Sequence, residues 1–308
     1  MKQRVFISRI SCAFGRRTGL HELQREGVTE DIIEGLRKRG FAGYLRFEGN
    51  WLEAWTSCIA DLLGSFGARR PEINAVLVVD ERANHSMAMP LLGELGLSDD
   101  IWVVGVGLQQ CAGSGAALRL ASGIISAGDH PGAVLVVISS IAIGELGRVA
   151  KKGDVLFSDG VVAFLVSRAE GPVELLAVEC RTYPSPEGEM QPTFDGEYLR
   201  CSHERLRSTI DAALRRASLG PEKISRIFCT NAGLLSHYII ASAAGLPREA
   251  VYSVSFGTLG HVLACDEMIG LSRHLRDTPN GADNYFLLVA WGPATMSACV
   301  VRTGPWRT

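Results

Sequence analysis

The chain of 308 residues is 47% hydrophobic and 21% charged, with a formal net charge of −2, a composition typical of a well-packed globular protein. No run of lysine and arginine points to nucleic acid, and no apolar stretch is long and uninterrupted enough to span a bilayer. Eight cysteines without a C-x-x-C pair or a Cys/His cluster argue against a metal site and a disulfide scaffold and favour the reducing cytoplasm. The apolar start is broken by Arg9, so no signal peptide is expected.

Hydrophobic periodicity predicts alternating strands and helices along almost the whole chain. The first series has strands expected over 4–10, 75–79, 101–107, 133–138 and 161–166, and helices over 29–38, 51–66, 86–95 and after Cys111. The second series has strands expected over 173–179, 224–229, 251–255, 284–290 and 296–302, and helices over 203–217, 234–244 and 261–275. Residues 11–50 are otherwise poorly periodic. Nearly continuous apolar strands between helices indicate a parallel or mixed sheet that is covered on both faces.

The two series also repeat in register. The offset that lays Cys111 on His261 lays Val76–Val79 on Arg226–Cys229 and Val134–Ile138 on Asn284–Leu288. We therefore expect two similar α/β halves, residues 1–168 with the cysteine and residues 169–308 with the histidine, packed about a pseudo-twofold axis. Such an axis brings the equivalent strand–helix junctions together, and it gives Cys111 and His261 a physical reason to meet.

Cys111 is the candidate nucleophile. It lies where a buried strand gives way to a helix, and the free N–H groups and positive dipole of a helix N-terminus favour a thiolate. The alternative is a small buried core residue. A thiolate beside an imidazole is the arrangement needed for covalent acyl transfer, with His261 carrying the proton. The backbone N–H groups of Cys111 and Gly292 are the candidate oxyanion donors.

Four segments resemble the motifs of β-ketoacyl-ACP synthase III-like proteins of the thiolase superfamily. They are the nucleophile motif Gln110–Gly113, the strand motif Phe157–Ala163, the third active-site loop Gly257–Asp266, and the C-terminal glycine turn and strand Gly292–Val301. This resemblance implies an α/β, five-layered αβαβα fold built from two duplicated halves. It also implies a homodimer or heterodimer formed across the strand that leads to the cysteine. The substrates would be acyl-CoA or a phosphopantetheinyl acyl-carrier protein, with no permanently bound cofactor.

The chain departs from the condensing members of this family at two positions. Thr230 stands where they carry the histidine of an H-x-A-N motif, and His261 stands where they carry an asparagine. Asn231 has two interpretations: it supplies an amide near the lost histidine, or it caps the following helix. Asp266 also has two: it orients the imidazole of His261, or it is an exposed helix carboxylate, which the sequence slightly favours.

Two further positions bear on the resemblance. Pro293 has no N–H and weakens the half of the oxyanion hole that the glycine turn would provide. Lys152 falls where the family has a basic residue near the CoA phosphates, although an ordinary loop lysine fits the pattern equally well.

These features predict a cytoplasmic acyltransferase in specialised metabolite or fatty-acid-related biosynthesis. Cys111 would accept an acyl group from acyl-CoA or acyl-carrier protein, and His261 would activate an oxygen, nitrogen or carbon nucleophile to receive it. Direct transfer is preferred because the His/Asn pair that stabilises an enolate is incomplete. The alternatives are a decarboxylative β-ketoacyl synthase that uses His261 alone, and a non-catalytic partner subunit of a heterodimeric synthase.

Overall fold

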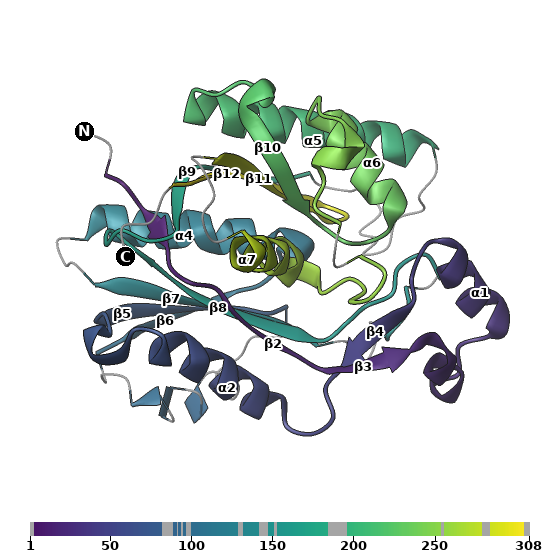
Figure 1. Ribbon diagram of the computed structural model, residues 1–308, viewed down its shortest axis with the longest axis horizontal. Helices are drawn as coiled ribbons and strands as arrows, with labels where there is room; N and C mark the ends of the chain where they lie inside the picture. The colour runs from purple at the N-terminus through teal and green to yellow at the C-terminus, as the bar shows by residue number, and fades with distance from the viewer. Residues whose placement is uncertain are drawn as a thin grey trace.

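The computed structural model describes residues 3–81, 89–90, 92–93, 95–96, 100–128, 132–141, 147–150, 153–183, 196–253, 256–278 and 284–304. The elements stack as five layers, helix, sheet, helix, sheet and helix (Figure 1). Helix α2 (Trp51–Gly64) is one outer layer, α4 (Gly113–Ala127) and α7 (Asp266–Asp277) form the central layer, and α5 (Gly196–Ala217) and α6 (Leu234–Ala243) form the other outer layer. The expected αβαβα fold is confirmed. Among the described helices, none combines the length and apolar character needed to cross a bilayer.

The strands show the duplication directly. The N-terminal half supplies β1 (Phe6–Ile7), β2 (Ser11–Phe14), β5 (Ile73–Val79), β6 (Trp102–Val106), β7 (Ala133–Ser140) and β8 (Gly160–Ser167). The C-terminal half supplies β9 (Val173–Thr182), β10 (Ile224–Cys229), β11 (Asn284–Trp291) and β12 (Thr295–Thr303). The parallel pair β5/β7 is followed by antiparallel β8, just as the parallel pair β10/β11 is followed by antiparallel β12. Strand β1 pairs with β8 and β9 and joins the halves in the order β10-β11-β12-β9-β1-β8-β7-β5-β6.

Alternate side chains of the middle strands enter different layers. On β7, Val134 and Val136 pack into the central core around α4 and α7, whereas Leu135 and Val137 pack against α2. Strand β11 divides its side chains between the central core and the core under α5 and α6 in the same way. Burial of both faces explains why these strands are continuous apolar runs in the sequence.

The structure corrects the expectation for the first fifty residues. The strand predicted over 4–10 shortens to β1, and β2, β3 (Arg16–Gly19) and β4 (Gly43–Arg46) were not predicted. The helix expected over 29–38 is present as α1 (Glu30–Lys38). Strands β3 and β4 form a small two-stranded antiparallel sheet that stands beside the layered body with α1 (Figure 1); η1 (Leu20–Glu26) and α1 lie between the two strands in the chain. Periodicity missed this sheet because each strand has only four residues and β3 is mostly exposed.

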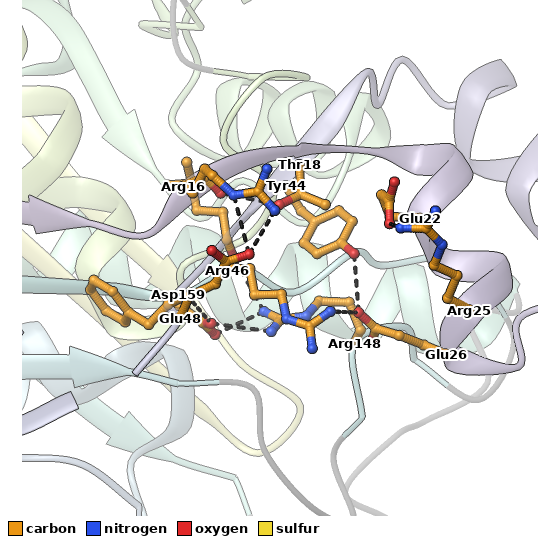
Figure 2. A network of polar contacts seen from close by, with 12 residues as sticks. Arg16, Thr18, Glu22, Arg25, Glu26, Tyr44, Arg46, Glu48, Arg148 and Asp159 are labelled. Atoms are coloured by element: carbon orange, nitrogen blue, oxygen red, sulfur yellow. Dashed lines mark hydrogen bonds and ion pairs between the residues drawn. The ribbon is translucent and has the colours of Figure 1, made fainter. Parts of the chain in front are cut away.

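Figure 2 shows the polar contacts around this sheet. Arg16 on β3 pairs with Glu48 just after β4, and Arg46 on β4 pairs with Glu26 at the end of η1. At the base of the sheet, buried Arg148 forms a two-pronged ion pair with buried Asp159, with N–O distances of 2.8 and 3.1 Å. Asp159 also accepts the backbone N–H of the residue after β4, Phe47, at 2.9 Å. The β3–β4 sheet is therefore held to the segment that enters β8, next to the site described below.

Two elements expected around His261 also differ. The strand predicted over 251–255 is wrong for its first part, because Val251 forms only an isolated bridge to Ile227 and the following two residues are irregular; residues 254–255 lie outside the described residues. The helix predicted to begin at His261 begins at Asp266, after the 3-10 turn η7 (Leu263–Cys265). His261 therefore lies in the loop before η7, at the candidate site described below.

Candidate active site

Cys111 lies in a strained turn between β6 and α4. The 3-10 turn η3 (Gln110–Ala112) carries it, and Leu108 and Gln110 adopt positive φ angles of 60° and 46°. Such angles are uncommon for residues other than glycine and are concentrated at functional sites. The Cys111 side chain is 6% exposed. The turn thus places a thiol at the start of a buried helix.

Cys111, His261 and Asp266 form a continuous relay. The Sγ of Cys111 lies 3.2 Å from Nε2 of His261, and Nδ1 of His261 lies 2.6 Å from Oδ2 of Asp266. Because a carboxylate only accepts, Nδ1 carries a proton and Nε2 faces the thiol. Asp266 is 2% exposed, so its interpretation as an exposed helix carboxylate is wrong, and it contacts the imidazole directly.

Backbone groups fix the carboxylate of Asp266. Its Oδ1 accepts the N–H of Val262 at 2.8 Å, and its Oδ2 accepts the N–H of Asn231 at 2.6 Å. His261 is held from the other side: its N–H donates to Leu156 and its carbonyl accepts from Ser158. The segment that holds the His261 backbone leads into Asp159 and its ion pair with Arg148 (Figure 2).

The environment keeps the imidazole charged. Burial by itself lowers the pKa of His261, but the facing Cys111 thiolate and the Asp266 carboxylate outweigh it and raise this pKa well above its usual value. The imidazole therefore favours its charged form, 3.2 Å from the Cys111 sulfur. A positive charge at this distance from a cysteine sulfur is the arrangement that activates a cysteine nucleophile.

The two strand–helix junctions meet, but not in the register that the sequence suggested. Gln110 and Leu263 are the first residues of η3 and η7, with matching φ angles of 46° and 45°, and the two turns pack against each other. The structural equivalent of Cys111 is thus Ala264. His261 comes earlier in the chain, in the loop before η7, and reaches the thiol from there.

Asn231 contacts the relay through its backbone N–H rather than through its side chain. Its N–H donates to Asp266, and its side-chain Oδ1 lies 3.1 Å from Nε2 of His237. Burial lowers the pKa of His237 to about 4, so the neutral ring donates to this oxygen. The interpretation of Asn231 as a helix cap is wrong, because Gly233 is the N-cap of α6 and no side chain caps it.

The second oxyanion donor expected from the glycine turn is already occupied. The N–H of Gly292 donates to the carbonyl of Thr295 at 2.9 Å within the turn that joins β11 and β12, and Pro293 has no N–H to replace it. Gly292 is therefore wrong as an oxyanion donor in this structure. The N–H of Cys111 remains the candidate. Lys152 lies outside the described residues.

Glu267, which sequence reasoning passed over, is buried behind the relay. It is 1% exposed, and its carboxyl accepts hydrogen bonds from Ser114 at 3.1 Å and Thr230 at 3.4 Å. Thr230 also accepts the N–H of Trp291 at 2.9 Å. Burial first, and then the charge of Asp266, raises the pKa of Glu267 well above its usual value. Burial and the neighbouring charge thus favour the protonated form of Glu267.

The raised pKa of Glu267 predicts a pH-dependent stability. A carboxyl whose pKa is raised on folding stabilises the protein at low pH, and this contribution is lost as pH rises from the unfolded pKa toward the folded one. We expect Glu267→Gln to be more stable than the wild type above about pH 5, with the difference in free energy of unfolding growing by roughly 1 kcal/mol per pH unit. Urea unfolding between pH 5 and 8 measures it, with exposed Glu249→Gln as the control. Parallel stability curves for Glu267→Gln and the wild type would contradict a protonated Glu267.

Comparisons with known proteins agree with this fold. Residues 108–184, which include Cys111, match the model of the 3-oxoacyl-[acyl-carrier-protein (ACP)] synthase III family. Among solved structures, ChlB3, described as an acyltransferase, is 20% identical, with coverage of 98% of each chain and a TM-score of 0.82. The 3-oxoacyl-[acyl-carrier-protein] synthase III of Aquifex aeolicus is 18% identical, with coverage of 97% of this chain and 99% of that one and a TM-score of 0.80. A variant of OleA from Xanthomonas campestris is 15% identical over 99% of each chain, with a TM-score of 0.80. A search of curated proteins found no match.

The fold is thiolase-like, with a cysteine at the start of the central helix α4. Within it, the resemblance to synthase III-like proteins is confirmed, because the whole chain has their fold and the segment around Cys111 carries their sequence pattern.

Proposed function

We propose that the chain is an acyltransferase that carries the acyl group on Cys111. The observation that supports this best is the buried relay from Sγ of Cys111 through His261 to Asp266. The donor would be acyl-CoA or acyl-carrier protein, as in the family that the sequence around Cys111 resembles.

The first half-reaction follows from the charge state of the relay. The Cys111 thiolate attacks the carbonyl carbon of the donor thioester, and the oxyanion that forms lies near the N–H of Cys111. Collapse breaks the bond between the carbonyl carbon and the donor sulfur. The imidazolium of His261 gives its Nε2 proton to the leaving thiolate, and the products are acyl-Cys111, neutral His261 and the free donor thiol.

Acylation prepares the second half-reaction by changing the electrostatics. The Cys111 charge that raises the pKa of His261 disappears in the thioester, whereas the burial that lowers it remains. The imidazole can then take a proton from an acceptor hydroxyl or amine, whose oxygen or nitrogen attacks the acyl carbon. Collapse releases the Cys111 thiolate and restores its pair with the protonated His261. Asp266 holds Nδ1–H throughout.

Direct transfer fits the site better than decarboxylative condensation. Thr230, in the place of the condensing histidine, directs its hydroxyl proton to Glu267 and accepts from Trp291. The side-chain oxygen of Asn231 is held by His237. Among the described side chains of the site, His261 is the ring donor left for the enolate formed by loss of CO2. ChlB3, whose fold is similar, is likewise described as an acyltransferase.

Carbon dioxide release separates the two reactions. The chain is loaded from acetyl-CoA and mixed with a malonyl thioester labelled in its free carboxylate. We expect no label to leave as CO2 above the Cys111→Ala background, and we expect malonyl-CoA alone to leave an intact malonyl group on Cys111. Release that disappears in His261→Ala would contradict pure transfer and support the condensing alternative.

We also propose that the chain forms a homodimer through β6. This strand ends the sheet, Trp102 on it is 55% exposed, and beside it a hollow of about 940 Å³ extends over α4. Small residues, Gly105 on β6 and Ala116 and Gly123 on α4, line this hollow and allow a close approach. An open apolar edge favours pairing with the same edge of a second copy.

The mass in solution tests this proposal. Light scattering should give twice the chain mass of 33.2 kDa, and Trp102→Glu should give a monomer because it places a charge in the contact. A wild-type monomer that dimerises only with another synthase-like chain would favour the partner-subunit alternative.

A further inference from the structure

The turn that carries Cys111 is held by one carboxylate from the neighbouring strand. Oε2 of Glu81 accepts the backbone N–H of Leu108 at 3.0 Å. Its Oε1 accepts the N–H groups of Gln109 and Gln110 at 3.0 and 2.5 Å. Three consecutive backbone donors thus converge on Glu81, and the next residue in the chain is the nucleophile. Hydrogen bonds to a charged acceptor are stronger than those between neutral groups.

The conformation held in this way is an unfavourable one. Leu108 and Gln110 both have positive φ angles, and a side chain makes this region costly for any residue other than glycine. Packing does not hold Leu108 in place, since its side chain is 86% exposed. The carboxylate of Glu81 supplies the compensating contacts, and Thr295 adds one from the far side by donating its hydroxyl to the Gln109 carbonyl at 2.6 Å.

The position of Glu81, an exposed residue, follows from the sheet. It follows the end of β5, which is the parallel neighbour of β6, so the carboxyl ends of the two strands lie side by side. The preceding residue, Asp80, is buried and accepts the hydroxyl of Ser139 on β7. The side chain therefore reaches the turn before Cys111 from the carboxyl end of β5.

We propose that Glu81 is a positioning residue that clamps residues 108–110 so that Sγ of Cys111 faces Nε2 of His261. The effect on turnover rests on the proposed acyl transfer, whereas the effect on thiol reactivity does not. Without the clamp the turn relaxes, the thiolate–imidazolium contact lengthens, and the thiol loses its activation.

Alkylation of Cys111 by iodoacetamide tests the clamp. At pH 7, Glu81→Ala should slow modification by about 100-fold, the size of effect that a displacement of about 1 Å causes at a reacting centre. The rate should recover toward about pH 8.5, where an isolated thiol ionises. Glu81→Gln should be intermediate, because its amide oxygen can still accept two of the three N–H groups. Glu53→Gln, an exposed glutamate on α2, should match the wild type.

A rescue separates positioning from a general loss of structure. Glycine adopts positive φ without penalty, so Leu108→Gly in the Glu81→Gln background should restore part of the lost rate. A structural defect elsewhere would lower the melting temperature without this recovery or the shifted pH profile. Wild-type alkylation rates across the pH range in Glu81→Ala would overturn the proposal. If Glu81→Ala does not fold, a Glu81→Gln/Leu108→Gly variant no faster than Glu81→Gln would overturn it instead.

The same samples distinguish this proposal from the function on which it rests. Iodoacetamide needs no acyl donor, so a wild type that alkylates rapidly but accepts no acyl group would contradict acyl transfer and leave the clamp standing. A Glu81→Ala variant that is alkylated and acylated at wild-type rates would contradict the clamp alone.

Discussion

Replacing His261 with alanine is expected to slow acylation of Cys111 by roughly 10³-fold, within the range that a positioned general acid–base contributes. Two effects combine. The thiolate loses the imidazolium 3.2 Å away, and the departing donor thiol loses its proton source. Rapid-quench mass spectrometry of the acyl-Cys111 peptide measures the rate directly.

The pH profile adds a second signature to this experiment. Burial lowers the pKa of His261, but Cys111 and Asp266 raise it well above its usual value, so the imidazolium persists as pH rises through neutrality. Wild-type acylation should therefore change little between pH 6 and 8, whereas the His261→Ala rate should climb with pH. His21→Ala, an exposed histidine, is the matched control. Equal rates and profiles for His261→Ala and the wild type would remove His261 from the mechanism.

Asp266→Asn should lower turnover by roughly 10³- to 10⁴-fold, as the equivalent change does in serine–histidine–aspartate triads. The amide keeps the size of the carboxylate but removes its charge. It also cannot accept all three of the donors that meet there, His261 Nδ1 and the N–H groups of Val262 and Asn231. The imidazole then loses its orientation and its fixed tautomer.

Steady-state kinetics with a saturating donor test this loss. Asp277→Asn makes the same change at an exposed position of the same helix and should leave the rate unchanged. An Asp266→Asn enzyme within a few-fold of the wild type would show that His261 works without its carboxylate.

The layered body could be predicted from the sequence because burial dominates its pattern. Strands such as β5 and β7 are covered on both faces, so their runs of valine, leucine and isoleucine are unambiguous. Strands β3 and β4 are short, and β4 is held to the body by Ser158, which accepts the N–H of Leu45, and by Asp159, which accepts the N–H of Phe47. Partners so far apart in sequence leave no local signal, and this part of the fold could not be predicted.

In the candidate site, too, some features could be predicted from the sequence and others could not. The juxtaposition of Cys111 and His261 could be inferred from the repeat, because a pseudo-twofold axis brings the junctions together even though their register differs. The role of Asp266 could be named only as one of two alternatives, and that of Glu267 could not be inferred. An acid at the start of a helix is ordinarily a surface residue that the helix dipole favours, and only tertiary burial reveals that both side chains face inward. The hydrogen bond from the Gly292 N–H to the Thr295 carbonyl within its turn could not be predicted from the sequence either.

The central claim is that Cys111 carries an acyl group, and the mass of the protein after exposure to donors tests it most directly. The wild-type chain is incubated with a panel of acyl-CoA and acyl-carrier-protein donors and analysed intact and after digestion. We predict an increase equal to the acyl group, located on the peptide that contains Cys111 and absent in Cys111→Ala. A folded wild type that gains no mass from any donor, or an adduct that persists in Cys111→Ala, would contradict the account.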